Sequence, residues 1–143
     1  MLRVLLVEDS SVVAMVTTAF FRRLGADVVV ATTLAEAIEK LERYHFSLAI
    51  LDLGLPDSGP DETVERFAAA AGPGLPYAVL TGSATQHIKE AALRFGVLTV
   101  IEKGQHQEEG LRAAWEYARE DATRHHTLTA SMLERIEGFL AKT

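Results

Sequence analysis

The chain has 143 residues, of which 48% are apolar and 24% charged, and its net charge is −6. This length provides one domain with a sizeable core and is too short for two full domains. The negative net charge disfavours autonomous nucleic-acid binding. The lack of cysteine excludes disulfides and thiolate metal sites. No apolar run approaches the roughly 18 residues of a membrane span. We therefore expect a cytoplasmic protein that binds neither nucleic acid nor membrane.

Short apolar segments bounded by turn residues alternate with segments of helical pattern. The predicted strands are residues 2–7, 27–31, 47–52, 76–80 and 97–101. The predicted helices begin after Ser10 or Ser11, at the capping box of Thr33, at Pro60, after Ser83 or Thr85, and at about Gln107. Because short loops join strands to helices, we expect right-handed crossovers and a parallel sheet. The predicted fold class is α/β, with a doubly wound five-stranded parallel sheet.

The helix that follows Ser10 has apolar residues at helical spacing. We expect these residues to face the sheet: Val12, Val13, Val16, Ala19, Phe20 and Leu24. The glycine that follows them, Gly25, is expected to end the helix in the C′ position, where glycine is favoured.

Residues 123–143 are predicted to be a C-terminal helical extension to a domain of residues 1–122. Apolar residues recur in this extension at helical spacing: Leu128, Met132, Leu133, Ile136, Phe139 and Leu140. A single amphipathic helix needs a partner surface, so we expect this face to be buried against protein. Three arrangements stay open: the segment folds back on its own domain, pairs with a second chain, or links to a further domain of a longer protein. Since no proline intervenes, it could also form one continuous helix with the fifth helix.

Polar side chains stand where the predicted strands end. Glu8 and Asp9 follow the first strand, Asp52 ends the third, Thr81 follows the fourth and Lys103 the fifth. In a parallel sheet these ends meet at one edge. Three carboxylates there repel one another unless a cation lies among them, and carboxylate oxygens suit Mg²⁺. With a lysine, a hydroxyl and a carboxylate nucleophile, the edge has the groups that phosphoryl transfer needs.

Four short segments, in this order, resemble the receiver domain of two-component response regulators. They are Leu-Val-Glu-Asp-Ser ending at Ser10, Leu-Asp-Leu-Gly-Leu-Pro ending at Pro56, Leu-Thr-Gly-Ser ending at Ser83, and Ile-Glu-Lys ending at Lys103. The resemblance covers roughly the first 120 residues and is to the chemotaxis-regulator-like, single-domain type. It implies a flavodoxin-like strand order of 2-1-3-4-5.

The resemblance also implies a role for each site residue. Asp52 is expected to accept a phosphoryl group from a sensor histidine kinase or a phosphotransfer protein. Thr81 is expected to bond one phosphoryl oxygen and Lys103 to pair with another. The implied ligands of Mg²⁺ are Asp9 as the main carboxylate, Glu8 as an outer one, Asp52, and the carbonyl of Gly54.

The expected function is a phosphorylation-dependent switch, not a turnover enzyme, which signals through a downstream protein target or a homodimer. We expect the homodimer to form through the face of the fourth helix, fifth strand and fifth helix, or through the C-terminal helix. An alternative is an unphosphorylated interaction scaffold, which is favoured by Val100 where the family has an aromatic residue and Gly104 where it has proline. A second alternative is an Asp-nucleophile phosphohydrolase of the haloacid dehalogenase type, which Gly54 disfavours because it replaces that family's second aspartate.

Overall fold

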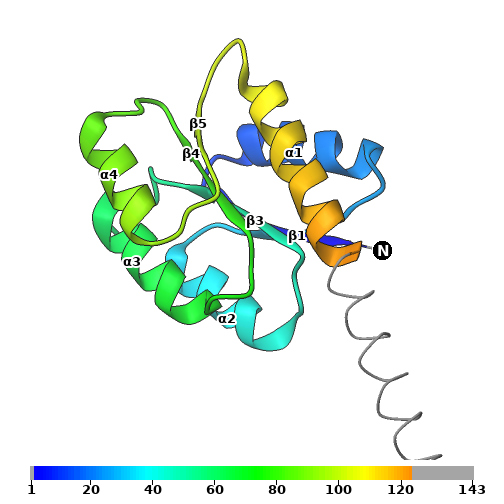
Figure 1. Ribbon diagram of the computed structural model, residues 1–143, viewed down its shortest axis with the longest axis horizontal. Helices are drawn as coiled ribbons and strands as arrows, with labels where there is room; N and C mark the ends of the chain where they lie inside the picture. Colours follow the sequence, from blue (N-terminus) through cyan, green and yellow to red (C-terminus); the bar gives the residue numbers. More distant parts are fainter. Residues whose placement is uncertain (1, 124–143) are drawn as a thin grey trace, which may run out of the picture.

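The computed structural model describes residues 2–123, which form a central parallel sheet with helices on both faces (Figure 1). The strands are β1 (Arg3–Val7), β2 (Asp27–Ala31), β3 (Leu48–Asp52), β4 (Tyr77–Thr81) and β5 (Val100–Glu102). Their order is β2-β1-β3-β4-β5, and every neighbouring pair is parallel. The predicted α/β fold with a 2-1-3-4-5 sheet is therefore confirmed.

Five helices connect and cover these strands. They are α1 (Ser11–Arg23), α2 (Leu34–Arg43), α3 (Pro60–Ala71), α4 (Gln86–Arg94) and a helix of residues 107–123. Figure 1 shows α1 and the helix of residues 107–123 on one face of the sheet, and α2, α3 and α4 on the other. Of the predicted extension, only Thr123 lies within the described residues.

The two faces of the sheet enclose two apolar cores, because successive side chains of a strand point to opposite sides. In β1, Val4 and Leu6 join the core under α1, whereas Leu5 and Val7 join the core under α2 and α3. Every residue of β3 and β4 is buried. Continuous apolar strands of this kind fit a parallel sheet covered on both faces, and they end in a fixed row at the carboxyl edge.

The fifth strand begins later than the sequence predicted, at Val100 instead of residue 97. The chain bends at Leu98, although the Leu98 N–H already donates to the carbonyl of Tyr77 at 2.8 Å. An apolar run can accompany a bend as well as a strand, so hydrophobicity alone placed this boundary too early. The strand ends at Glu102, so Lys103 follows it directly.

The buried face of α1 also differs from the prediction. The residues that it buries are Ala14, Thr17, Phe20 and Phe21. The exposed residues include Ala19 and three that we call the α1 stripe: Val12, Met15 and Val16, with exposed fractions of 64%, 66% and 59%. Phe20 and Phe21 pack edge to face at 5.3 Å between ring centroids, and Phe21 contacts Trp115 at 6.1 Å. Burial of two adjacent aromatic rings outweighs burial of the smaller valines, because the rings remove more apolar area from water.

The start of α2 is held by a carboxylate that lies 23 residues further along the chain. Asp57, in the loop after β3, accepts the Leu34 N–H at 2.9 Å and the Ala35 N–H at 3.1 Å. These bonds, that of Leu34 first, lower the pKa of Asp57 below its usual value. The Thr33 hydroxyl caps the same end by accepting the Glu36 N–H at 3.1 Å. The loop after the predicted phosphoacceptor is thereby tied to a helix on its own face of the sheet.

We expect Asp57→Ala to lower the free energy of unfolding by about 1 kcal/mol at pH 7, the usual effect of losing a helix cap. Since the folded-state pKa of Asp57 is depressed, its contribution is present above the unfolded value of 3.8 and is lost as the pH falls through the folded value. Urea unfolding of both proteins at pH 7 and near pH 3 measures this. An equal difference at the two pH values would contradict the assignment.

Candidate functional site

Three carboxylates meet at the carboxyl edge of the sheet. Glu8 and Asp9 follow β1, and Asp52 is the last residue of β3, the neighbour of β1. One oxygen from each of the three side chains lies within 4.8 Å of the others. Glu8 and Asp52 are nearly inaccessible, with exposed fractions of 1% and 3%, whereas Asp9 is exposed. The predicted cluster therefore forms, and two of its members are buried at its base.

The backbone after β1 fixes the direction of these carboxylates. The Glu8 N–H donates to the carbonyl of Ala31 at 2.9 Å, which continues the pairing of β1 with β2 by one residue. The Ser10 N–H donates to Oε1 of Glu8 at 3.1 Å, and the Ser10 hydroxyl accepts the Val13 N–H at 3.4 Å as the cap of α1. The same tight turn thus begins α1 and holds the Glu8 carboxylate at the sheet edge.

Lys103 brings a positive charge to the cluster. Its Nζ lies 3.0 Å from Oδ1 of Asp52 and 3.7 Å from Oε2 of Glu8. The Lys103 N–H donates to the carbonyl of Thr81 at 2.8 Å, so β4 holds the backbone from which the side chain extends. Burial lowers the pKa of Lys103, but the hydrogen bond and charge of Asp52 outweigh it, and the pKa rises above its usual value. Lys103 therefore stays positively charged at neutral pH.

Glu8 is a buried carboxylate whose charged form is disfavoured. Burial raises its pKa from 4.5 to about 7, and the charge of Asp52 adds to this against the opposing effects of the Ser10 N–H and of Lys103. Its Oε2 is a buried atom with no hydrogen-bond partner. A buried oxygen without a donor, beside two further carboxylates, is the environment in which a hard divalent cation is favourable. The residues present thus fit a Mg²⁺ ion.

Thr81 and Gly82 lie on the neighbouring strand end. Asp52 pairs with Leu80 across β3 and β4, which places Thr81 one residue beyond the level of Asp52. The Thr81 hydroxyl donates to the carbonyl of Ser83 at 3.2 Å and accepts the Ser83 N–H at 3.3 Å. A Cβ added at Gly82 would meet no atom within 4 Å. Thr81 is thus near the cluster, but its hydroxyl bonds to its own turn.

Two glycines of the sequence prediction lie beside Asp52 and in the loop after β5. Gly54 follows Asp52 by two residues, and a Cβ there would lie 3.5 Å from Oδ2 of Asp52, so its backbone passes close to the carboxylate. Gly104 has φ of +139°, in the region that favours glycine. The loop after β5 therefore uses glycine for a backbone conformation that proline, with φ near −65°, does not adopt.

The structure thus brings Glu8, Asp9, Asp52 and Lys103 into one cluster. The α1 stripe, which begins three residues after Asp9, is a feature of this edge that the sequence prediction missed. Apolar residues at helical spacing normally indicate a buried face, so the sequence carried no sign that these would be exposed. Within residues 2–123, no helix has both the length and the apolar character that a membrane crossing requires.

The sequence matches the family described as "Response regulator receiver domain" over residues 4–115. Among curated proteins, it is 31% identical over 102 residues to the "Autoinducer 2 sensor kinase/phosphatase LuxQ" of Vibrio vulnificus (strain YJ016). The alignment covers 71% of this chain and 12% of that relative. The chain therefore spans only a small part of the length of this much longer protein.

Solved structures give the same result for the fold. A CheY-like receiver domain protein from Methanospirillum hungatei JF-1 aligns with a TM-score of 0.77 and 27% identity, over 87% of this chain and 98% of that chain. The receiver domain of sensor histidine kinase PA1611 from Pseudomonas aeruginosa PAO1 aligns with a TM-score of 0.70 and 26% identity, over 82% and 97%. That second structure contains a magnesium ion coordinated in its active site cleft.

Proposed function

The chain belongs to the response regulator receiver domain family, and we propose that it is a signalling switch in which Asp52 accepts the phosphoryl group. Domains of this family are phosphoacceptor switches rather than turnover enzymes, bind Mg²⁺ at an acidic pocket, and interact with histidine kinases or phosphotransfer proteins. The observation that carries the proposal is the Lys103 ammonium 3.0 Å from Asp52, beside the carboxylates of Glu8 and Asp9.

In the proposed reaction, Asp52 attacks the phosphorus of the donor in line. An O–P bond forms on Asp52 while the bond between phosphorus and the donor atom breaks. The Lys103 ammonium lies against Asp52 and stabilises negative charge that develops on the phosphoryl oxygens. The proposed ligands of Mg²⁺ are Glu8, Asp9, Asp52 and the carbonyl of Gly54. When bound, the ion would supply further positive charge for the phosphoryl oxygens.

The proposed response to phosphorylation begins at Thr81. Its hydroxyl leaves Ser83 and donates to a phosphoryl oxygen, which releases the turn that leads into α4. The surface of α4, β5 and the helix of residues 107–123 is the proposed output face for a downstream protein target or a homodimer. Leu93 of α4 is 85% exposed and supports this choice. The proposal also includes a receiver domain of residues 1–122, an extension of residues 123–143, and a location in the cytoplasm.

The α1 stripe is the proposed contact for the protein that donates the phosphoryl group. It lies on the first turns of the helix that follows Glu8 and Asp9, so a partner that reaches Asp52 passes beside it. We expect Met15→Glu to lower the rate of phosphotransfer from the cognate donor about tenfold, as loss of a central interface contact does, without changing phosphorylation by acetyl phosphate. The matched control is Leu93→Glu on α4. Equal losses with both phosphodonors would contradict this role for α1.

Acetyl phosphate with Mg²⁺, followed by intact mass measurement, tests the proposed function. The expected result is an increase of one phosphoryl mass that requires Mg²⁺ and disappears with EDTA. A chain that gains no mass from acetyl phosphate or from its cognate kinase would instead be the unphosphorylated scaffold. Measuring the size of the protein before and after phosphorylation then tests the proposed homodimer.

A further inference from the structure

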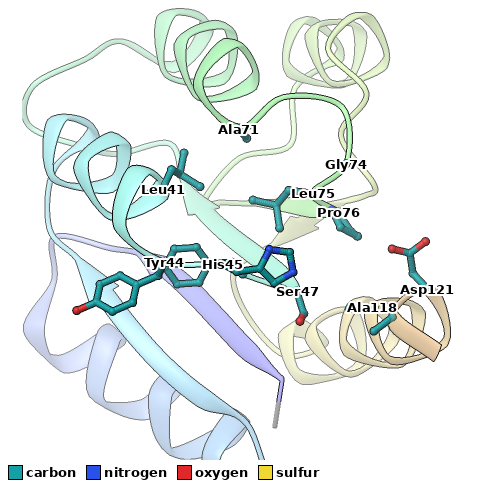
Figure 2. A pocket seen from close by; sticks show the side chains of 12 residues that line it. Leu41, Tyr44, His45, Ser47, Ala71, Gly74, Leu75, Pro76, Ala118 and Asp121 are labelled. Carbon is teal, nitrogen blue, oxygen red and sulfur yellow. The ribbon is translucent and has the colours of Figure 1, made fainter. Parts of the chain in front are cut away.

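A cavity of about 520 Å³ lies at the edge of the sheet opposite the phosphoacceptor site. It is surrounded by the end of α2, the segment before β3, the loop before β4, and the end of the helix of residues 107–123 (Figure 2). We call it the amino-edge groove, because β3 and β4 begin there. At about 3.3 Å per residue, a five-residue strand separates this groove from Asp52 by roughly 16 Å.

The walls of the amino-edge groove are mainly apolar. Figure 2 shows Leu41, Leu75 and Ala118, from three different elements, around a common space. Phe46 and Pro76 add to the apolar lining, and His45, Ser47 and Asp121 add polar groups. An open space of this size with mainly apolar walls is suited to apolar side chains, and its few polar groups can fix the orientation of the bound segment.

The last residues that the structure describes lie at this groove. Asp121 and Ala122 line it, and the described residues end at Thr123. The sequence continues for 20 residues, with apolar positions at helical spacing: Leu128, Met132, Leu133, Ile136, Phe139 and Leu140. Residues 124–127 can span about 13 Å when extended, which is enough for the chain to reverse its direction.

We propose that the amino-edge groove is the docking site for the chain's own C-terminal segment, residues 128–140, through its apolar face. A tether of four residues gives the segment a very high effective concentration at the groove, which favours it over a separate partner. The segment supplies the apolar side chains and the groove supplies the surface that an amphipathic helix needs. The docked segment would leave both the α1 stripe and α4 free.

This proposal does not depend on phosphorylation, and it is tested on the full chain. Because the protein has no cysteine, a nitroxide can be attached at a single introduced thiol. With the label on His45→Cys, at the groove, we expect strong broadening of the amide NMR signals of residues 128–140. The same label on Leu93→Cys, on the exposed face of α4, should leave those signals sharp. The absence of broadening from His45→Cys would overturn the proposal.

Two further measurements separate docking within one chain from the alternatives. In a mixture of isotope-labelled chains and nitroxide-labelled chains, broadening between different molecules would overturn the proposal in favour of a second copy. The variant Leu133→Ser/Ile136→Ser, which changes only the segment, should abolish broadening within one molecule while the signals of residues 2–123 keep their positions. X-ray scattering of the unmodified chain should give a radius of gyration of about 15 Å, and a clearly larger monomer would also overturn the proposal.

Discussion

Asp52→Asn is expected to abolish the phosphoryl adduct that acetyl phosphate and Mg²⁺ form on the native chain. Asparagine keeps the size of the side chain but has no carboxylate oxygen to attack phosphorus. Asp52 is also the carboxylate that Lys103 approaches most closely, at 3.0 Å, so the substitution removes both the nucleophile and the nearest negative charge to the ammonium group. Intact mass measurement should therefore show less than a few per cent of the native adduct.

The matched control for this variant is Asp57→Asn. Asp57 lies five residues after Asp52 and has a carboxylate too, but that carboxylate bonds to the start of α2. Its replacement should leave the adduct at the native level. If the adduct persisted in Asp52→Asn, the phosphoacceptor would be another side chain, and the role proposed for Asp52 would be wrong.

The sequence predicted the arrangement of the fold because each strand is a short apolar run between turn residues. Once the strands are taken as parallel, their carboxyl ends must share an edge, and this brings Glu8, Asp52 and Lys103 together without any knowledge of side-chain geometry. The same reasoning failed for the orientation of α1. Its apolar residues lie on more than one side, and only the packing of Phe20 and Phe21 in three dimensions decides which side is buried.

Other features of the site depend on contacts that a sequence pattern does not encode. The bond from Asp57 to α2 joins positions 23 residues apart and requires the path of the loop after β3. The Thr81 hydroxyl bonds to the carbonyl and the N–H of Ser83. Whether it instead points to the cluster depends on the rotamer of the Thr81 side chain. The raised pKa of Glu8 likewise arises mainly from burial, which depends on how the whole chain packs around the end of β1.

Glu8→Gln is expected to stabilise the metal-free protein at alkaline pH. The folded-state pKa of Glu8 is raised from 4.5 to about 7, so the folded chain retains a proton that the unfolded chain releases. The native protein therefore loses stability as the pH rises from about 4.5 to about 7, and the whole penalty is present above that range. In the variant this dependence is absent, and at pH 8 its free energy of unfolding should be higher by on the order of 3 kcal/mol.

Urea unfolding in EDTA from pH 4.5 to pH 8 measures this difference. The two proteins should be nearly equal at pH 4.5 and diverge as the pH rises. The control Glu102→Gln changes an exposed glutamate at the end of β5 and should follow the native curve. Excess Mg²⁺ should stabilise the native protein at pH 8 more than Glu8→Gln, because stabilisation by a ligand that binds only the folded state grows with the logarithm of its concentration divided by its dissociation constant. If the curves for the native protein and Glu8→Gln stayed parallel in EDTA, folding would not raise the pKa of Glu8, and the burial of Glu8 would not be the reason that this edge favours a cation.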